Sequence, residues 1–353
     1  MAIKTIEMDL EYMNLIQNPP QTPQDMYSQA ASNDRITCDT WRRPWIDQKH
    51  QNSKKYGPLG QKTIAPLFNK YKNQPCIVVG SGPSLAKNVH LLKNHVVKDV
   101  DGKDRELSWD EIGIPVISCL HNFHYLVDHG AHVDYFVTLD AGPVVTEEVW
   151  EGGLHEPDYY WEKTKDYTLL AYVSTHPTLL EKWQGKVMFF ASPIPALDIY
   201  DEMQKDDPVY TLISSGGNVL GACVYIAKIM GCNPVIFTGA DFCFSYTKQF
   251  HPWKSKYDGK LGHAFRAIDV YGNKVLTWQS YFNFAQWFNW LCMTIPGIYV
   301  NCTEGGIMGC SQDGILMQTN PMDLSRALKM YSFNFDIAKQ CQKPTEPDNI
   351  ILY

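Results

Sequence analysis

The sequence lacks the features that mark membrane and secreted proteins. No apolar run approaches the roughly 18 residues that a membrane-spanning helix requires. The longest candidate, residues 288–300, is interrupted by Asn289, Pro296 and Gly297. Acidic residues stand near the start, at Glu7 and Asp9, where a signal peptide would need an apolar core. We therefore expect no membrane span and a cytoplasmic protein.

The chain also lacks an excess of basic residues and any closely spaced cysteine pair. Lys and Arg together number 31 against 38 Asp and Glu, which gives a formal net charge of −7. Binding to a nucleic-acid backbone requires a basic face, so we expect no nucleic-acid partner. None of the ten cysteines forms a C-x-x-C pair, which disfavours a zinc knuckle or a thioredoxin-like motif.

The chain divides into three segments that differ in composition and in apolar pattern. Residues 1–70 are rich in Asn, Gln and Pro and show weak apolar periodicity, which predicts an N-terminal extension with one or two helices that clasps the main domain. In residues 71–310, short apolar runs alternate with helical segments. This alternation predicts an α/β domain with a Rossmann-like, mostly parallel sheet and helices on both faces. We interpret residues 311–353 as a helical C-terminal tail.

The expected elements follow from these runs. We predict strands over residues 76–79, 115–119, 135–139, 169–173, 187–190, 235–238 and 298–301. We predict helices over residues 85–92, 123–128, 218–230 and 278–293, the last with Thr277 as its N-cap. Ligands of such folds bind outside the carboxyl ends of the strands, so the loops that follow the strands are the candidate site.

The first of these loops contains Gly80, Ser81, Gly82 and Ser84. The two glycines let the backbone approach a ligand closely, and the free N–H groups of a helix start suit a phosphate. The loop lacks the Lys of a Walker motif, and Leu85 stands where a dinucleotide fingerprint has its third glycine. A tight turn without a ligand and a flavin site both remain open as alternatives.

Three further loops carry polar residues, and each of these residues can have either a role in ligand binding or a purely structural role. Asn122 can donate and accept hydrogen bonds to a ligand, or it can cap a helix. Asp140 can bind a ribose hydroxyl, an acceptor or a metal, or it can bond its own turn. Ser214, Ser215 and Gly216 open the helix that begins near residue 218 and suit a nucleotide, or serve in ordinary capping.

The last two loops add an acid, an aromatic ring and a histidine. Asp241 and Phe242 end a strand and can hold a ribose and a base. His251 follows and is a candidate general base, with His263 as its rival. Glu304 is a candidate base or a ligand for a metal or a hydroxyl, or a solvated residue of a glycine-rich turn.

The order of these motifs resembles the MptE-like family. That family includes 6-hydroxymethylpterin diphosphokinase and the motility accessory factors (Maf proteins), which attach nonulosonic sugars to flagellin. The matching stretches are residues 80–85, 134–140, 215–219, 239–242 and 301–306. Two of them also resemble bacterial sialyltransferases that use CMP-sialic acid. That resemblance implies that Asn122 supports the leaving phosphate and that His251 deprotonates the acceptor.

The resemblance implies a transferase that moves a sugar, with a nonulosonic acid favoured, from a nucleotide donor to a hydroxyl of a protein or glycan. The donor could be CMP-linked, and no metal is needed. Ser81, Gly82 and Ser84 would bind the donor phosphate or ribose, and the segment 245–272 would form a lid. The residues that would cradle the nucleoside are Ser214, Ser215, Gly216, Asp241 and Phe242.

Two other functions stay open. One is a Mg²⁺-dependent transfer of pyrophosphate from ATP to a pterin-like alcohol, with the ion held by Asp140 and Asp241. The loop at Asp140 carries a single acid where the diphosphokinase relatives have two, which weakens this reading. The other is a non-catalytic binding protein on the same fold. The oligomeric state cannot be predicted from the sequence.

Overall fold

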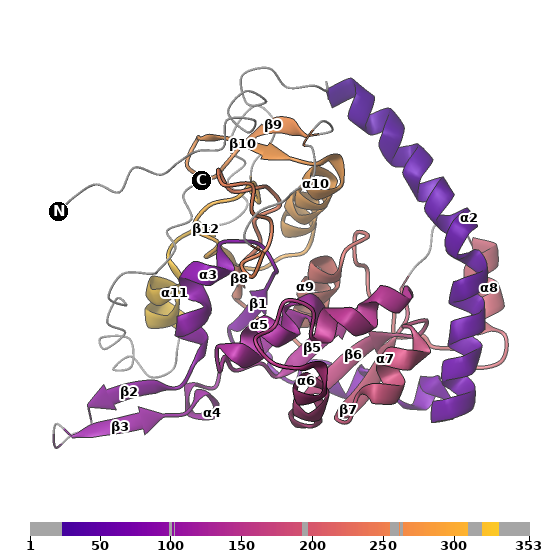
Figure 1. Cartoon of the computed structure of the whole chain (residues 1–353), viewed down its shortest axis with the longest axis horizontal. Coiled ribbons are helices and arrows are strands. Elements are labelled where there is room, and N and C mark those ends of the chain that lie inside the picture. Colours follow the sequence, from indigo (N-terminus) through magenta and orange to yellow (C-terminus); the bar gives the residue numbers. More distant parts are fainter. Residues whose placement is uncertain are drawn as a thin grey trace.

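The computed structural model describes residues 23–98, 101, 103–192, 197–254, 261, 264–309 and 320–331. Its main element is an eight-stranded sheet with the order β12-β11-β8-β1-β4-β5-β6-β7 (Figure 1). Every pair of neighbouring strands in it is parallel. The strands are β1 (Cys76–Val79), β4 (Val116–Cys119), β5 (Tyr135–Thr138), β6 (Thr168–Tyr172), β7 (Lys186–Phe190), β8 (Val235–Thr238), β11 (Tyr299–Asn301) and β12 (Asn320–Pro321).

The strands confirm the prediction of a mostly parallel α/β sheet, because the seven predicted strands occur within one residue of their expected bounds. All residues of β1, β4, β5 and β8 are buried. Strands that are covered on both faces have this continuously apolar pattern, which is why the short β-branched runs identified them.

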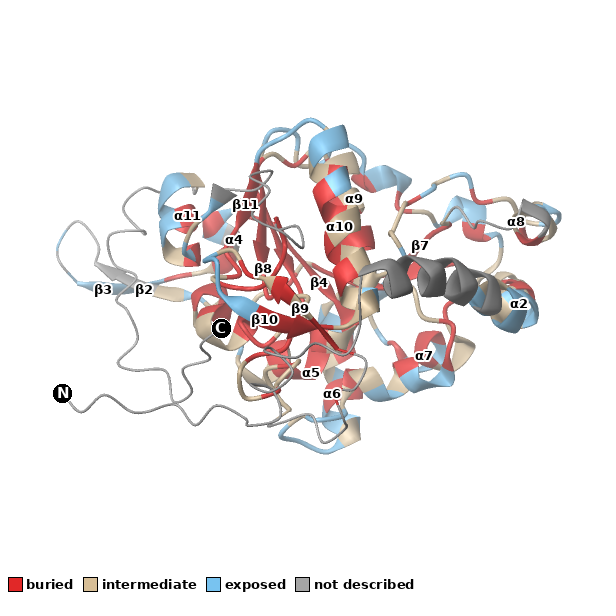
Figure 2. Ribbon diagram, turned by 90° about the horizontal axis from the view of Figure 1, so that it is seen from above, coloured by how far each residue is buried: buried red, intermediate tan, exposed pale blue. Residues whose placement is uncertain are grey.

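Helices cover both faces of the sheet, as predicted (Figure 2). The chain passes from β1 through β4, β5 and β6 to β7 in one direction and from β8 to β11 and β12 in the other. Right-handed crossovers therefore place α5 (Phe123–Asp128), α6 (Pro157–Lys163) and α7 (Pro177–Lys182) on one face. They place α9 (Val219–Ile229) and α10 (Gln279–Thr294) on the opposite face. The first crossover contains α3 (Leu85–Asn88) and the 3-10 turn η3 (Val89–Leu92).

This topology has one switch point, between β8 and β1. The connections that leave these two neighbouring strands run to opposite faces of the sheet, so their loops diverge at the carboxyl ends. Such a divergence leaves a crevice, and ligands of doubly wound folds bind there. The topology of the sheet alone therefore identifies the crevice between β8 and β1 as the expected position of a ligand.

The N-terminal segment packs against the same core. Helix α2 (Pro23–Tyr56) and the 3-10 turns η1 (Leu59–Gln61) and η2 (Ala65–Leu67) contribute buried Ile46, Leu59 and Leu67 to it. The backbone N–H of Ile64 donates to the carbonyl of Phe189, in β7, at 3.0 Å. Asn52 Nδ2 donates to the carbonyls of Val173 and Thr175 at 3.0 and 2.9 Å, which ties α2 to the carboxyl end of β6. The predicted boundary at residue 70 stays a prediction.

Two antiparallel hairpins lie outside the main sheet and were not predicted. One pairs β2 (His95–Lys98) with β3 (Asp104–Leu107) and projects from the body of the protein, next to α4 (Trp109–Ile112) (Figure 1). The other pairs β9 (Phe265–Ile268) with β10 (Lys274–Thr277). The prediction of Thr277 as the N-cap of α10 is wrong. Thr277 ends β10, its hydroxyl donates to the carbonyl of Phe242 at 2.6 Å, and Trp278 takes the N-cap position.

The remaining elements are α8 (Leu197–Gln204), which packs against α2, and α11 (Leu324–Tyr331). Within the segment predicted as a C-terminal tail, β12 extends the sheet, and Leu324, Ala327 and Leu328 of α11 enter the core. The rest of that tail, His263 and part of the predicted lid lie outside the described residues. In the described part of the chain, no helix combines the length and the apolar character needed to cross a membrane.

Candidate functional site

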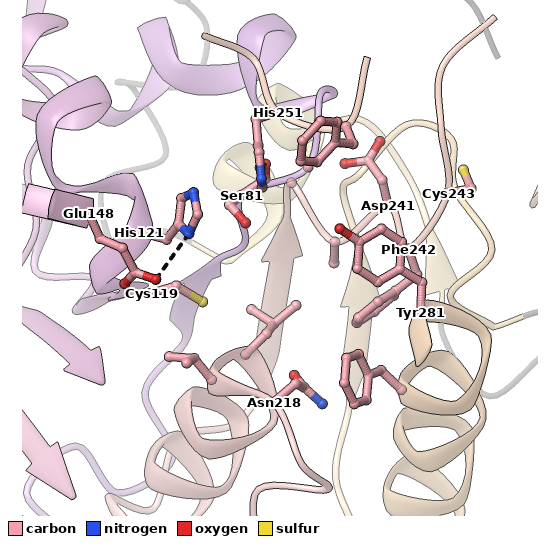
Figure 3. Close-up of a pocket in the computed structure, with 17 residues that line it drawn as sticks. Ser81, Cys119, His121, Glu148, Asn218, Asp241, Phe242, Cys243, His251 and Tyr281 are labelled. Carbon is pink, nitrogen blue, oxygen red and sulfur yellow. Dashed lines mark hydrogen bonds and ion pairs between the residues drawn. The ribbon is translucent and has the colours of Figure 1, made fainter. Parts of the chain in front are cut away.

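A cavity of about 280 Å³ lies at the switch point between β8 and β1 (Figure 3). Ser81 and Gly82 line it from the loop after β1, and the segment 239–243 lines it from the loop after β8. Asn218 contributes from the start of α9, and Tyr281 from the first turn of α10. The loop after β4 adds further lining residues on the opposite wall. The cavity therefore occupies the place that the topology selects.

Glycines let the two central loops pack directly on each other. A Cβ atom on Gly80 would lie 2.3 Å from the carbonyl oxygen of Gly239, and one on Gly239 would lie 2.4 Å from that of Gly80. A Cβ on Gly82 would lie 1.9 Å from Oδ2 of Asp241. These contacts leave no room for a side chain, so the glycines are required by the approach of one loop to the other.

The side chain of Asp241 joins the same two loops. Its carboxyl is 1% exposed and accepts a hydrogen bond from the Ser84 hydroxyl at 2.7 Å and from the Ser84 N–H at 3.3 Å. Burial raises the pKa of Asp241 to about 7, against the opposing effects of Ser84 and Lys87. The carboxyl thus occupies the start of α3, where the sequence argument places a phosphate.

The amides of the first loop are largely paired within the protein. The N–H of Gly80 donates to the carbonyl of Thr238 at 2.8 Å, and that of Gly82 donates to the carbonyl of Gly239 at 2.9 Å. Ser84 is buried and its hydroxyl bonds Asp241, so a direct contact with a donor would require that bond to open. Ser81 remains as the polar residue of this loop that lines the cavity.

His251 is held with one nitrogen available for chemistry. Its side chain is 8% exposed, and its Nδ1 lies 2.8 Å from the carbonyl oxygen of Ser81. Because a carbonyl only accepts, Nδ1 carries the hydrogen and Nε2 keeps a lone pair. The ring stacks on Trp253 at 4.7 Å and on His121 at 4.5 Å. Burial, reinforced by His121, lowers the pKa of His251 to about 3, so the ring is neutral at physiological pH.

The structure adds a second histidine that the sequence reasoning did not select. His121 lines the cavity, and its Nδ1 lies 3.4 Å from Oε1 of Glu148, which also lines it (Figure 3). Glu148 lies in the 3-10 segment η5 (Pro143–Val149). His121 follows β4 directly, so the strand-end rule could have found it. Glu148 reaches the site only through the path of η5, for which the sequence holds no local signal.

The predicted site residues divide into two groups. Five line the cavity: Ser81, Gly82, Asp241, Phe242 and His251. Eight do not: Gly80, Ser84, Asn122, Asp140, Ser214, Ser215, Gly216 and Glu304. Of the second group, Gly80 and Ser84 support the first loop. The stretch from Ser214 to Gly216 precedes Asn218, which lines the cavity and caps α9 by accepting from the N–H of Gly221 at 2.8 Å.

Three of the predicted residues make internal contacts instead. Asn122 is fully buried, and its Nδ2 donates to the carbonyl of Val79 at 3.3 Å. Asp140 Oδ1 accepts from the N–H of Gly142 at 2.6 Å, which is the turn geometry named as its alternative, and burial raises the pKa of Asp140. Glu304 adopts a φ of +56°, and its carbonyl accepts from Lys87 Nζ at 3.0 Å.

A Mg²⁺ ion shared by Asp140 and Asp241 does not fit this arrangement. The two residues follow β5 and β8, and β1 and β4 lie between those strands. Three strand spacings separate the two positions by about 14 Å, far more than a common ion can bridge at about 2 Å from each ligand. Among the described residues, no group of three His, Cys, Asp or Glu side chains is placed to hold a metal ion.

The fold is that of a doubly wound α/β protein with a cavity at its switch point. The chain belongs to the MptE-like family: the family model, described as 6-hydroxymethylpterin diphosphokinase MptE-like, matches residues 51–247, more than half of the chain. This confirms the family that the sequence motifs indicated.

A solved structure shares the fold. The MAf glycosyltransferase from Magnetospirillum magneticum AMB-1 superposes with a TM-score of 0.56 over 85% of this chain, at 17% sequence identity. This chain spans 41% of the length of that protein. At this identity the likeness concerns the fold. No match is found among curated proteins.

Proposed function

We propose that the protein is a glycosyltransferase that moves a sugar from a nucleotide-activated donor to a hydroxyl acceptor. The observation that carries this proposal is the cavity at the switch point, which brings together a polar first loop, a helix start and a histidine with a free Nε2. The fold shared with a protein described as a glycosyltransferase supports the same reaction class.

The two walls of the cavity suit the two parts of such a donor. Phe242, Phe250, Tyr281 and Phe284 line it with aromatic rings on which a nucleobase can stack. The phosphate would lie by Ser81 and the start of α9, because Asp241 already occupies the start of α3. The positive end of the α9 dipole would stabilise the negative charge that develops on the leaving phosphate.

The acceptor hydroxyl must lose a proton as it attacks the sugar. His251 is the general base that the sequence analysis predicts for this step. The free Nε2 of His251 can accept a hydrogen bond from that hydroxyl. A nonulosonic acid remains the proposed sugar and a CMP-linked donor the proposed substrate, on the resemblance described above. A protein or glycan remains the proposed acceptor, and no metal is proposed as a cofactor. The cytoplasm remains the proposed location.

Thermal unfolding with a panel of nucleotides tests the proposal. CMP, CDP, UDP, GDP and ATP are each added at about 100 times an expected dissociation constant, with and without Mg²⁺. A nucleotide that binds at this excess stabilises the fold by about 2.7 kcal/mol, or roughly 3 °C in Tm for a chain of this size. We expect a nucleotide other than ATP to produce this shift without Mg²⁺.

The other results would change the conclusion. A shift with ATP alone, and only when Mg²⁺ is present, would favour pyrophosphate transfer. No shift with any nucleotide would refute a nucleotide-dependent transferase. Ser81→Ala should reduce the shift because Ser81 lines the cavity, whereas Thr294→Ala, on the exposed end of α10, should leave it unchanged.

A further inference from the structure

Two histidines that line the cavity stack on each other but have different surroundings. The rings of His121 and His251 stack with centroids 4.5 Å apart and planes inclined by 28°. The side chain of His121 is 35% exposed and faces the carboxylate of Glu148, which is 20% exposed. His251 instead is 8% exposed and bonds a backbone carbonyl. His121 is therefore the more accessible ring and has an acidic partner. His251 is enclosed, and its hydrogen-bond partner is a backbone carbonyl.

A histidine that takes a proton becomes an imidazolium, so its surroundings must stabilise positive charge. Around His251, burial and the neighbouring His121 oppose that charge and lower the pKa of His251 to about 3. At His121, Oε1 of Glu148 lies 3.4 Å from Nδ1 and can pair with the charge. A carboxylate placed behind the imidazole in this way fixes the tautomer with Nδ1–H and leaves Nε2 as the base.

We infer that His121, oriented by Glu148, accepts the proton of the acceptor hydroxyl, and that His251 remains neutral and positions the reacting groups through Nε2. The assignment rests on the proposed sugar transfer and replaces only the identity of the base. In the step, the hydroxyl oxygen forms a bond to the anomeric carbon while the bond from that carbon to the donor phosphate breaks. The phosphate leaves with the electron pair, and the hydroxyl proton moves to Nε2 of His121.

Other titratable groups also face His121. Glu148 faces it from η5, His251 from the loop after β8, His124 from α5 and Asp140 from the loop after β5. Glu148 is the one of these in ion-pair contact with the ring. Glu148→Gln removes the negative charge that pairs with the imidazolium formed in the reaction, so it should lower kcat.

The test measures nucleotide release from a panel of CMP-, UDP- and GDP-linked sugars, including CMP-N-acetylneuraminic acid, by the wild type and four variants. We expect His121→Asn to lower kcat by about 10²-fold to 10³-fold while the Tm shift with the bound nucleotide is kept. Glu148→Gln should lower kcat about 10-fold and leave KM unchanged. The matched control, Glu147→Gln, changes the exposed neighbour in η5 and should leave kcat and KM unchanged.

His251→Asn distinguishes the two assignments. We expect it to raise KM and to lower kcat less than His121→Asn does, because it removes a positioning contact. A loss of kcat in His251→Asn with activity retained in His121→Asn would overturn the assignment but leave the proposed transferase intact. A kcat that Glu148→Gln does not lower would also overturn it. No release by the wild type from any donor of the panel would refute the proposed function itself, and the assignment with it.

Discussion

The buried carboxyl of Asp241 makes the stability of this fold depend on pH. Burial raises the pKa of Asp241 from its usual 3.8 to about 7, so the native state favours the protonated form. The stabilising effect is fully present below pH 3.8, where both states are protonated, and it is lost as the pH rises through 7. Asp241→Asn keeps the size of the side chain and an oxygen that can accept from Ser84 but removes the titration.

The magnitude follows from the linkage between protonation and folding. A rise of about 3 in pKa corresponds to at most about 4 kcal/mol, at about 1.4 kcal/mol for each pKa unit. Between pH 5 and pH 8 the wild type should lose about 2–3 kcal/mol of unfolding free energy through this group alone. The loss is not reduced by solvent screening, because the side chain is 1% exposed.

Urea denaturation of the wild type and Asp241→Asn at pH 5 and pH 8 measures this difference. The variant should gain about 2–3 kcal/mol relative to the wild type between the two pH values. Asp166→Asn, at an exposed position, serves as the control for the loss of a carboxyl and should show no such gain. A constant difference between Asp241→Asn and the wild type would refute the reasoning. It would mean that Lys87 and the start of α3 hold the carboxylate ionised.

Two other predictions concern the walls of the cavity. His251 should stay neutral, with its hydrogen on Nδ1, from pH 5 to pH 8 in imidazole NMR spectra, because burial lowers its pKa to about 3; a titration midpoint above pH 5 would contradict this. Gly82→Ala should lower the unfolding free energy in urea by about 1–3 kcal/mol, because its Cβ would meet the Asp241 carboxyl at 1.9 Å. Gly130→Ala, where a Cβ meets nothing within 4 Å, should cost only the roughly 1 kcal/mol of its φ of +61°; equal losses in both variants would argue against the contact.

The sheet could be predicted from the sequence because its strands are buried on both faces. A run such as Cys76–Val79 is apolar along its whole length, and burial of every residue favours that pattern. The outer hairpins escaped prediction for the opposite reason. Strand β3 reads Asp-Arg-Glu-Leu with three exposed residues, and no apolar pattern marks it. The hairpin of β9 and β10 turns at residues 269–273, and β9 lies within the segment 245–272 that the sequence analysis interprets as a lid.

The position of the candidate site could be predicted from the sequence more easily than the side chains that line it. The rule for strand ends selected the loops that hold Gly82, Asp241 and His251, and the cavity lies among them. The rule gives no side-chain direction, so it could not foresee that Asn122 turns back to the carbonyl of Val79. It also could not find Glu148, which reaches His121 from a different loop.

The tight contact between the loops after β1 and β8 has a consequence for how the cavity could change. Glycine backbones and a shared carboxyl lock those loops together, so substitutions there would disturb folding before they altered recognition. Tyr281 and Phe284, in the first two turns of α10, reach the cavity as side chains. Changes in what the cavity accepts would therefore arise by exchanging residues on that helix, while the locked loops stay as they are.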